Sequence, residues 1–171
     1  MLDFNSKIDK YLFPDTSYHL TLCTLRIDSD EELKIVKNVL DKVFKNEDVL
    51  SEFPIEIDFQ GIGEFYDKTL YGKSADKNAS DKLDYVKDII LKELKNNSIN
   101  IAGNYYEFVP HLSIVKIDAK IDSLTQMLPA VFWEQFKDFN FGKQNVDTLK
   151  LCQMGNINLN RNYVVDHKIN I

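Results

Sequence analysis

An internal repeat is the feature that most constrains the fold of this chain. Residues 18–22 are Tyr-His-Leu-Thr-Leu and residues 110–114 are Pro-His-Leu-Ser-Ile, so His19 and His111 lie 92 residues apart. The same offset, without a gap, aligns six further pairs of like type: Thr21 with Ser113, Phe44 with Phe136, Ile57 with Leu149, Phe59 with Leu151, Gly63 with Gly155 and Tyr71 with Tyr163. The repeat predicts two similar lobes related by an approximate twofold axis.

The apolar pattern predicts one order of elements, strand, helix, strand, strand, in both halves. In the first half these are a strand around His19, a helix over 30–45 capped by Ser29 or Asp30, and strands over 54–59 and 69–73. In the second half they are a strand around His111, a helix within 122–139 that Pro129 interrupts, and strands over 146–154 and 163–171. A helix over 80–95, capped by Ser80, joins the halves, and residues 72–79 form the most loop-like connection.

Antiparallel strands with helices gathered on one face define an α+β fold. The 171 residues, 44% of them hydrophobic, are enough for one core. We therefore predict a single domain over 1–171, with lobes over about 17–75 and 105–171 linked by the helix over 80–95.

Composition excludes several classes of partner. No apolar stretch approaches the ~20 residues of a membrane span, and the N-terminus lacks a secretory signal, which predicts a cytoplasmic protein without a membrane partner. The net charge of −6 argues against nonspecific binding of long nucleic acid, but it permits binding of a small phosphorylated ligand. Cys23 and Cys152 are too few for a disulfide framework, and we expect both to be reduced core residues.

The two histidine motifs place polar and apolar side chains on opposite faces. Side chains alternate along a strand, so Leu20 and Leu22 should point into the core while His19 and Thr21 point away. The same alternation puts Leu112 and Ile114 inward, with His111 and Ser113 on the polar face. If a twofold axis relates the halves, these polar faces can meet in one cleft.

Two imidazoles and two hydroxyls suit phosphodiester chemistry without a metal or another cofactor. One imidazole can take a proton from an attacking hydroxyl while the other gives a proton to the departing oxygen, each typically contributing ~10²- to 10⁴-fold. The hydroxyls of Thr21 and Ser113 can then bind the nonbridging phosphate oxygens.

These motifs resemble the two-histidine (2H) phosphoesterases, whose signature is a pair of His-x-Thr/Ser motifs on facing strands. Segments 17–22, 59–65, 108–113 and 149–154 carry the resemblance, which is strongest to the branch containing the phosphoesterase-like domain of an A-kinase anchoring protein and certain viral 2′,5′-phosphodiesterases. It implies the bilobal LigT-like fold, with two antiparallel sheets, outer helices and a central cleft. By motif position, His19 and His111 resemble the catalytic pair, with Thr21 and Ser113 as phosphate ligands.

For this branch, the resemblance implies metal-independent cleavage of 2′,5′-linked oligoadenylate to a 2′,3′-cyclic phosphate and a 5′-hydroxyl. The expected partner is a short oligoadenylate or another small RNA or nucleotide, bound by a monomer. Five aromatic residues are candidates for stacking on a base, although most aromatics in such a chain belong to the core: Tyr18, Phe65, Tyr71, Phe108 and Tyr163.

Other interpretations remain open at this point. The chain could instead be a 2′,3′-cyclic phosphodiesterase or an RNA 3′-end processing enzyme of the same superfamily, or a module that binds AMP-like nucleotides without turnover. No ligand spacing indicates a metal site. We expect His167 to be a surface or structural residue, and Lys73, Lys116 and Arg161 either to neutralise a phosphate or to be simply solvated.

Overall fold

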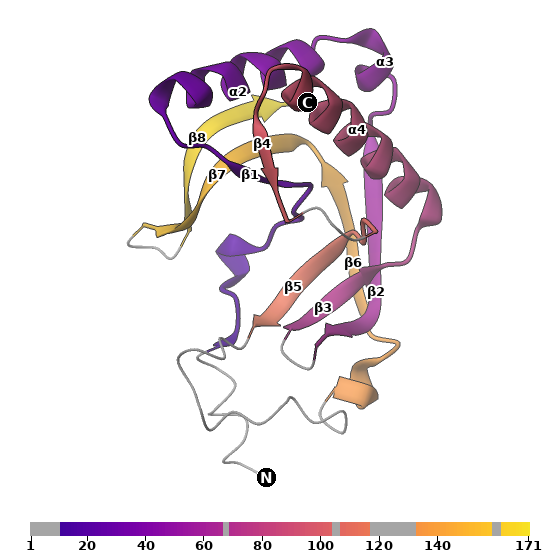
Figure 1. The fold of residues 1–171 in the computed structure, drawn as a ribbon. Helices are drawn as coiled ribbons and strands as arrows, with labels where there is room; N and C mark the ends of the chain where they lie inside the picture. The colour runs from indigo at the N-terminus through magenta and orange to yellow at the C-terminus, as the bar shows by residue number, and fades with distance from the viewer. Residues whose placement is uncertain (1–10, 67–68, 104–106, 117–132, 159–161) are drawn as a thin grey trace.

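The fold is α+β, with antiparallel strands and two long helices on their outer side (Figure 1). The computed structural model describes residues 11–66, 69–103, 107–116, 133–158 and 162–171. Within these ranges the helices are α2 (Asp30–Val43), α3 (Glu47–Leu50) and α4 (Lys77–Asn96), with 3-10 turns η2 (Asp15–Ser17) and η3 (Glu134–Phe136). The strands are β1 (Thr24–Arg26), β2 (Ile55–Phe65), β3 (Thr69–Ser74), β4 (Asn100–Ala102), β5 (His111–Lys116), β6 (Asn140–Val146), β7 (Thr148–Ile157) and β8 (Tyr163–Asn170).

The described strands form three antiparallel groups. Four strands pair in the order β5-β3-β2-β6, while β7 pairs with β8 and β1 pairs with β4. The four-stranded sheet thus takes β2 and β3 from the first half of the chain and β5 and β6 from the second. The hydrogen bonds that close this sheet therefore run between the two halves of the chain, from β2 to β6 and from β3 to β5.

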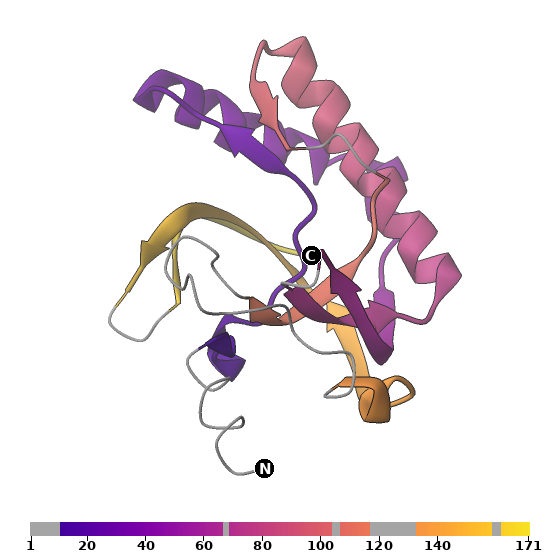
Figure 2. The same cartoon turned by 60° about the horizontal axis from the view of Figure 1, so that its bottom comes forward.

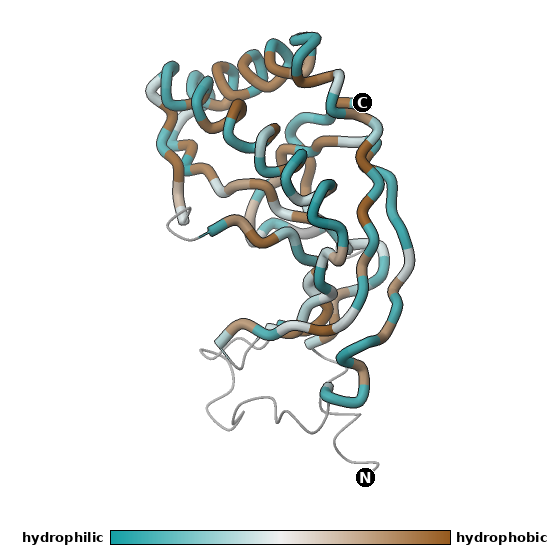
Figure 3. Tube along the Cα trace, turned by 90° about the vertical axis from the view of Figure 1, so that its right-hand side faces the viewer, coloured by the Kyte–Doolittle hydropathy of each residue, from teal (hydrophilic) through white to brown (hydrophobic). Residues whose placement is uncertain are grey.

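Helices α2 and α4 cover one end of the molecule above β7 and β8 (Figures 1 and 2). Apolar and polar residues alternate along both helices, as an amphipathic helix requires (Figure 3). Val36 and Leu40 of α2 and Ile90 and Leu94 of α4 are buried in one cluster. Partly buried side chains of the strands beneath pack against it, including Leu149, Leu151 and Ile169.

The predicted helix over 30–45 is confirmed as α2, and its N-cap is Ser29, whose hydroxyl accepts a hydrogen bond from the Glu32 amide. The helix between the halves, however, begins earlier than predicted. Asp76, not Ser80, caps α4 through its carboxylate, which accepts hydrogen bonds from the amides of Asn78 and Ala79. Ala79 is the one apolar residue in the first turn of α4, too little for apolar periodicity to indicate that turn.

The predicted loop over 72–79 is confirmed only at Ala75 and Asp76, which connect β3 to α4. Gly72 lies within β3, opposite Ile62 of β2 and Leu112 of β5, and the residues from Lys77 onward belong to α4. Gly72 also belongs to the predicted strand over 69–73, and its pairing with two neighbouring strands confirms that prediction at this residue.

The segment around His19 differs from the prediction of a strand. Residues 18–23 form no strand, and β1 begins only at Thr24, where β4 supplies a pairing partner. The predicted side-chain alternation nevertheless holds, because Leu20 and Leu22 pack against the core. The strand around His111 is confirmed as β5.

The C-terminal strands were predicted in part. The strand over 146–154 corresponds to β7, and that over 163–171 to β8, but β4 and β6 were missed. β6 contains Asn, Gly, Lys and Gln in place of an apolar alternation, so only its pairing with β2 reveals it. Most of the predicted helix within 122–139, including Pro129, falls outside the described residues, and its described part contains the helical residue Trp133 followed by η3.

Both cysteines are free, but only Cys23 is a core residue. Burial raises the pKa of its thiol to about 11. Cys152 is exposed, which corrects the prediction for that residue: its neighbour Leu151 packs against the core, and alternation along β7 turns Cys152 the other way. No helix in the described ranges is long and apolar enough to cross a membrane.

Candidate active site

The two histidine motifs rest on the same part of the core. Leu20, between His19 and Thr21, and Leu112, between His111 and Ser113, both pack against one buried cluster. The members of that cluster are Ile55, Ile57, Phe59, Ala79 and Leu83. The predicted inward side of each motif is therefore confirmed.

Backbone contacts also join the segment before His19 to β5. Leu12 forms an isolated antiparallel bridge with Val115, and the Phe13 amide donates a hydrogen bond of 2.9 Å to the Ile114 carbonyl. The chain therefore runs beside β5 immediately before the 3-10 turn η2 leads it to His19. This arrangement ties the approach to one histidine to the strand that carries the other.

Each imidazole is held by the chain just before it. Nδ1 of His19 lies 2.9 Å from the Ser17 carbonyl oxygen, and Nδ1 of His111 lies 2.7 Å from the Val109 carbonyl oxygen. A carbonyl oxygen only accepts, so Nδ1 carries the hydrogen in both rings. Nε2 is then the nitrogen that can take up or release a proton, and both histidines have this arrangement.

A tyrosine contacts each imidazole, and the two tyrosines are themselves a repeat pair. The ring of Tyr163 meets the ring of His19 edge-on, with centroids 5.1 Å apart. The ring of Tyr71 lies 5.3 Å from that of His111, with an interplanar angle of 63°. Tyr71 and Tyr163 are also 92 residues apart, one in each half of the chain. Each histidine contacts the tyrosine of the opposite half.

The surroundings of the two histidines differ in burial. His19 and Thr21 are exposed, whereas His111 and Ser113 are half-buried. Phe65 provides a second ring against His111, at 5.1 Å, and stacks on Tyr71 at 4.2 Å. Burial and, to a smaller extent, the charge of Glu64 raise the pKa of the Tyr71 phenol.

The structure distributes the five proposed base-stacking residues among different environments. Tyr18 is exposed over 42% of its surface. Phe108 packs against the core, and the Lys87 ammonium lies 4.8 Å from its ring centroid, which leaves less of the ring for a base. Phe65, Tyr71 and Tyr163 contact histidine rings instead.

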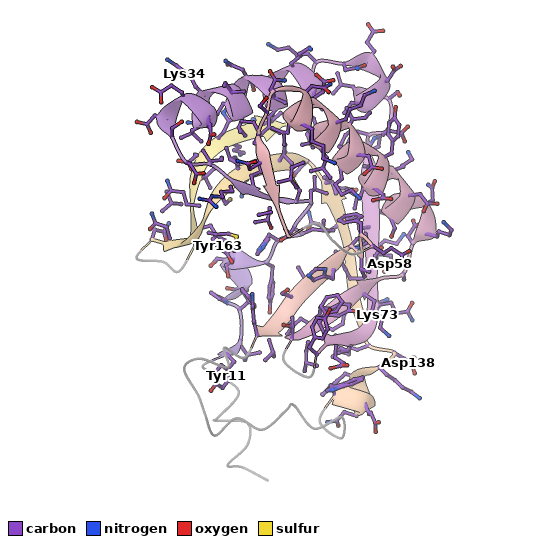
Figure 4. The ribbon with its side chains drawn as sticks, in the orientation of Figure 1. Tyr11, Lys34, Asp58, Lys73, Asp138 and Tyr163 are labelled. Carbon is purple, nitrogen blue, oxygen red and sulfur yellow. The ribbon has the colours of Figure 1, made fainter. Side chains whose placement is uncertain are left out.

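Strand pairing places a lysine beside His111. The sequence indicated this residue, Lys73, only as one of three basic residues that could neutralise a phosphate. Lys73 of β3 is directly opposite His111 of β5, and Tyr71 is opposite Ser113. Directly opposite residues of antiparallel strands share a face, so these four side chains form one surface, which we call the site face. Lys73 is exposed there, and Figure 4 marks its position on β3.

The third histidine belongs to a different part of the molecule. Nε2 of His167 lies 2.8 Å from a carboxylate oxygen of Asp41, which links β8 to α2, so His167 is structural, as predicted. Arg161 lies outside the described residues, and Lys116 ends β5. Among residues with described positions, no three His, Cys, Asp or Glu side chains gather as metal ligands.

Solved structures of known proteins share this fold. A protein of Thermus thermophilus matches with a TM-score of 0.63 at 16% identity, over 99% of this chain and 88% of its own. E. coli LigT, solved with 3′-AMP, matches with a TM-score of 0.62 at 12% identity, over 99% and 88% of the two chains. The protein therefore has the LigT-like fold of the 2H phosphoesterases.

The sequence defines the family more narrowly. Over residues 1–171 it matches the family described as the AKAP7 2′5′ RNA ligase-like domain, and the chain belongs to that family. Human A-kinase anchor protein 7 isoform gamma is 23% identical over 155 residues, which are 88% of this chain and 44% of that protein. The chain thus spans less than half the length of this curated relative.

Proposed function

We propose that the protein is a phosphodiesterase that cleaves 2′,5′-linked oligoadenylate, with His19 and His111 as the proton-transferring pair. The observation that carries the proposal is the matched anchoring of both imidazoles, which leaves Nε2 of each for proton exchange. Membership of the AKAP7 2′5′ RNA ligase-like family supports action on a phosphoester. The complexes of E. coli LigT with 3′-AMP and ATP support an adenine nucleotide as ligand.

The proposed reaction needs no water in its first step. One imidazole takes the proton from the 3′-hydroxyl, whose oxygen attacks the adjacent phosphorus and forms the 2′,3′-cyclic phosphate. The bond from phosphorus to the 5′-oxygen breaks, and the other imidazole gives that oxygen its proton. Each histidine then holds the opposite protonation state, and proton exchange with solvent restores the pair.

Thr21 and Ser113 are proposed to hold the nonbridging phosphate oxygens. Each hydroxyl is two residues after its histidine, so an extended backbone directs both side chains to the same face. A hydroxyl donates a hydrogen bond to the charge that grows on these oxygens as the attacking oxygen adds. In this scheme the chain supplies every group, so the reaction proceeds without a metal or cofactor.

The direct test is cleavage of triadenylate in the presence of EDTA, with 2′,5′- and 3′,5′-linked substrates compared. We expect the wild type to cleave only the 2′,5′ linkage, and His19→Ala and His111→Ala each to lose turnover while the circular dichroism spectrum is unchanged. His167→Ala is the matched control, because it removes an imidazole outside the site, and it should retain turnover. A folded His19→Ala or His111→Ala variant with a near-normal rate would contradict the two-imidazole scheme.

The same assay separates the alternatives. Hydrolysis of 2′,3′-cyclic AMP without cleavage of either triadenylate would indicate a cyclic phosphodiesterase. Calorimetric binding of AMP without any turnover, unchanged in the double His→Ala variant, would indicate a nucleotide-binding module. Either result would overturn the proposed cleavage of 2′,5′-oligoadenylate.

A change of leaving group assigns the acid and the base. Adenosine 2′-(4-nitrophenyl phosphate) releases nitrophenolate, which needs no proton from a general acid. The alanine variant of the acid histidine should therefore recover most of its activity on this substrate, whereas the variant of the base histidine should not. Equal loss in both variants would contradict a division into one acid and one base.

A further inference from the structure

We infer that Tyr71, lying over Gly63 and stacked on Phe65, is a positioning residue that fixes the ring of His111. Gly63 of β2 and Tyr71 of β3 are directly opposite in the antiparallel pair. A Cβ atom at residue 63 would lie 2.6 Å from the Tyr71 hydroxyl oxygen and 2.7 Å from its Cε2. The tyrosine ring therefore fills the space that any other residue at position 63 would need.

The requirement for glycine comes from the ring and not from the backbone. The φ angle of Gly63 lies outside the left-handed region, so alanine can adopt the same backbone conformation. Only the neighbouring phenol excludes a methyl group. An aromatic ring laid across an opposite glycine is a known way to cover a gap in a sheet, and here it also fixes where the ring points.

The Tyr71 ring, which covers Gly63, also contacts the imidazole of His111. Its ring stacks on Phe65 with centroids 4.2 Å apart and planes 21° apart. Both rings contact the His111 imidazole, Phe65 with an interplanar angle of 81° and Tyr71 with one of 63°. The hydrogen bond from Nδ1 to Val109 holds one edge of the imidazole, and the two rings restrict its rotation about that bond.

The described residues around His19 lack this arrangement. Gly155 corresponds to Gly63 in the repeat, but a Cβ there would meet nothing within 4 Å. Tyr163 is the only aromatic residue described against the ring of His19. Tyr71 is also only 8% exposed, so it supports the histidine and does not offer a free face to a base.

Nuclear magnetic resonance of histidine labelled with ¹³C at Cε1 tests the inference without relying on turnover. We expect Gly63→Ala and Tyr71→Leu to shift the His111 signal and to leave the His19 signal in place. Tyr163→Leu is the matched control, and it should shift only the His19 signal. Tyr71→Phe keeps the ring and should restore the His111 signal to near its wild-type position.

Activity provides the second measurement, and this part rests on the proposed phosphodiesterase function. A displaced imidazole lowers kcat, by about 100-fold for a shift near 1 Å, with little change in KM, and Tyr71→Phe should rescue kcat. If Gly63→Ala does not fold, Phe65→Leu takes the place of that variant in both measurements. It removes one of the two ring contacts to His111.

The outcomes are distinguishable. An unmoved His111 signal in folded Gly63→Ala and Tyr71→Leu would overturn the positioning role, whatever the protein cleaves. Shifted signals in a protein that cleaves no oligoadenylate would support the positioning role and overturn only the proposed function. A lower melting temperature with an unmoved signal and an unchanged kcat would show that the rings only stabilise the fold.

Discussion

Each histidine of the candidate site uses Nδ1 to bind its own chain, which leaves Nε2 as the nitrogen that can exchange a proton. In His19 and His111 alike, the accepting carbonyl belongs to the residue two positions earlier, so the same kind of contact selects the same tautomer twice. The hydroxyls of Thr21 and Ser113 follow at matched distances along the chain. At the residue scale, each half of the repeat thus supplies one imidazole bound to a carbonyl two residues earlier and one hydroxyl two residues later.

The hydroxyls give a residue-scale prediction. Thr21→Val keeps the shape of the side chain and removes its hydrogen-bond donor, and it should lower kcat by about 10²- to 10³-fold. Because Thr21 is exposed, the unfolding free energy should change little. Steady-state kinetics and a urea titration measure both quantities, with Thr21→Ser as the control that restores the donor. A normal kcat in Thr21→Val would remove Thr21 from the site.

The ammonium group of Lys73 on the site face gives a second residue-scale prediction. Lys73 lies opposite His111, so Lys73→Gln should raise KM for an anionic substrate and weaken the dependence of KM on salt, because one attractive charge is lost. Lys34→Gln makes the same charge change on α2, at the far side of the molecule from Lys73 (Figure 4), and should leave KM unchanged. Equal effects of the two variants would show that only net charge matters.

At the scale of elements, the ends of the helices depend on single polar side chains. The Asp76 carboxylate accepts hydrogen bonds of 2.8 and 3.2 Å from the amides of Asn78 and Ala79, which otherwise have no partner within α4. α4 carries Ala79 and Leu83 of the cluster beneath both motifs. The start of this helix therefore affects the support of the site.

Loss of this cap has a measurable cost. Asp76→Ala should lower the free energy of unfolding by about 1 kcal/mol, within the range seen for other N-caps. Asp81→Ala is the matched control: it removes an exposed carboxylate paired with Lys77 on the same helix and should cost less than about 0.5 kcal/mol. Urea titrations compare the variants. A larger loss in Asp81→Ala would refute the assignment of the cap.

At the scale of the whole molecule, burial makes stability depend on alkaline pH through Cys23. The pKa of this thiol rises from 9.0 to about 11 on folding, because burial disfavours the thiolate. Below pH 9 the thiol is protonated in both states, so it does not change stability. As the pH rises through the unfolded pKa, only the unfolded chain loses the proton, and the folded state loses stability until the pH reaches about 11.

This linkage can be isolated by a difference measurement. Between about pH 8 and pH 10.5, wild type should lose about 2 kcal/mol more unfolding free energy than Cys23→Ala. Tyrosine and lysine residues titrate in the same window, but they do so in both proteins, and the comparison cancels them. Cys152→Ala serves as the control at an exposed thiol, with a smaller difference expected. Parallel pH profiles for wild type and Cys23→Ala would contradict the buried thiol.

Local patterns determined much of this protein. Periodicity and a cap at Ser29 or Asp30 predicted α2, and alternation predicted which sides of residues 19–22 and 111–114 face the core. The paired His-x-Thr/Ser motifs predicted the family. These features follow from side chains close together in the sequence, where the rules of helix and strand geometry apply directly.

Long-range pairing decided the rest. β6 has no apolar alternation and becomes a strand because β2 offers it hydrogen bonds. The opposition of Lys73 to His111, and that of Tyr71 to Gly63, exists only once the strands take their register. The sequence alone thus determined the reactive groups and their repeat, whereas tertiary structure decided their neighbours, because a register is set by the packing of the whole sheet.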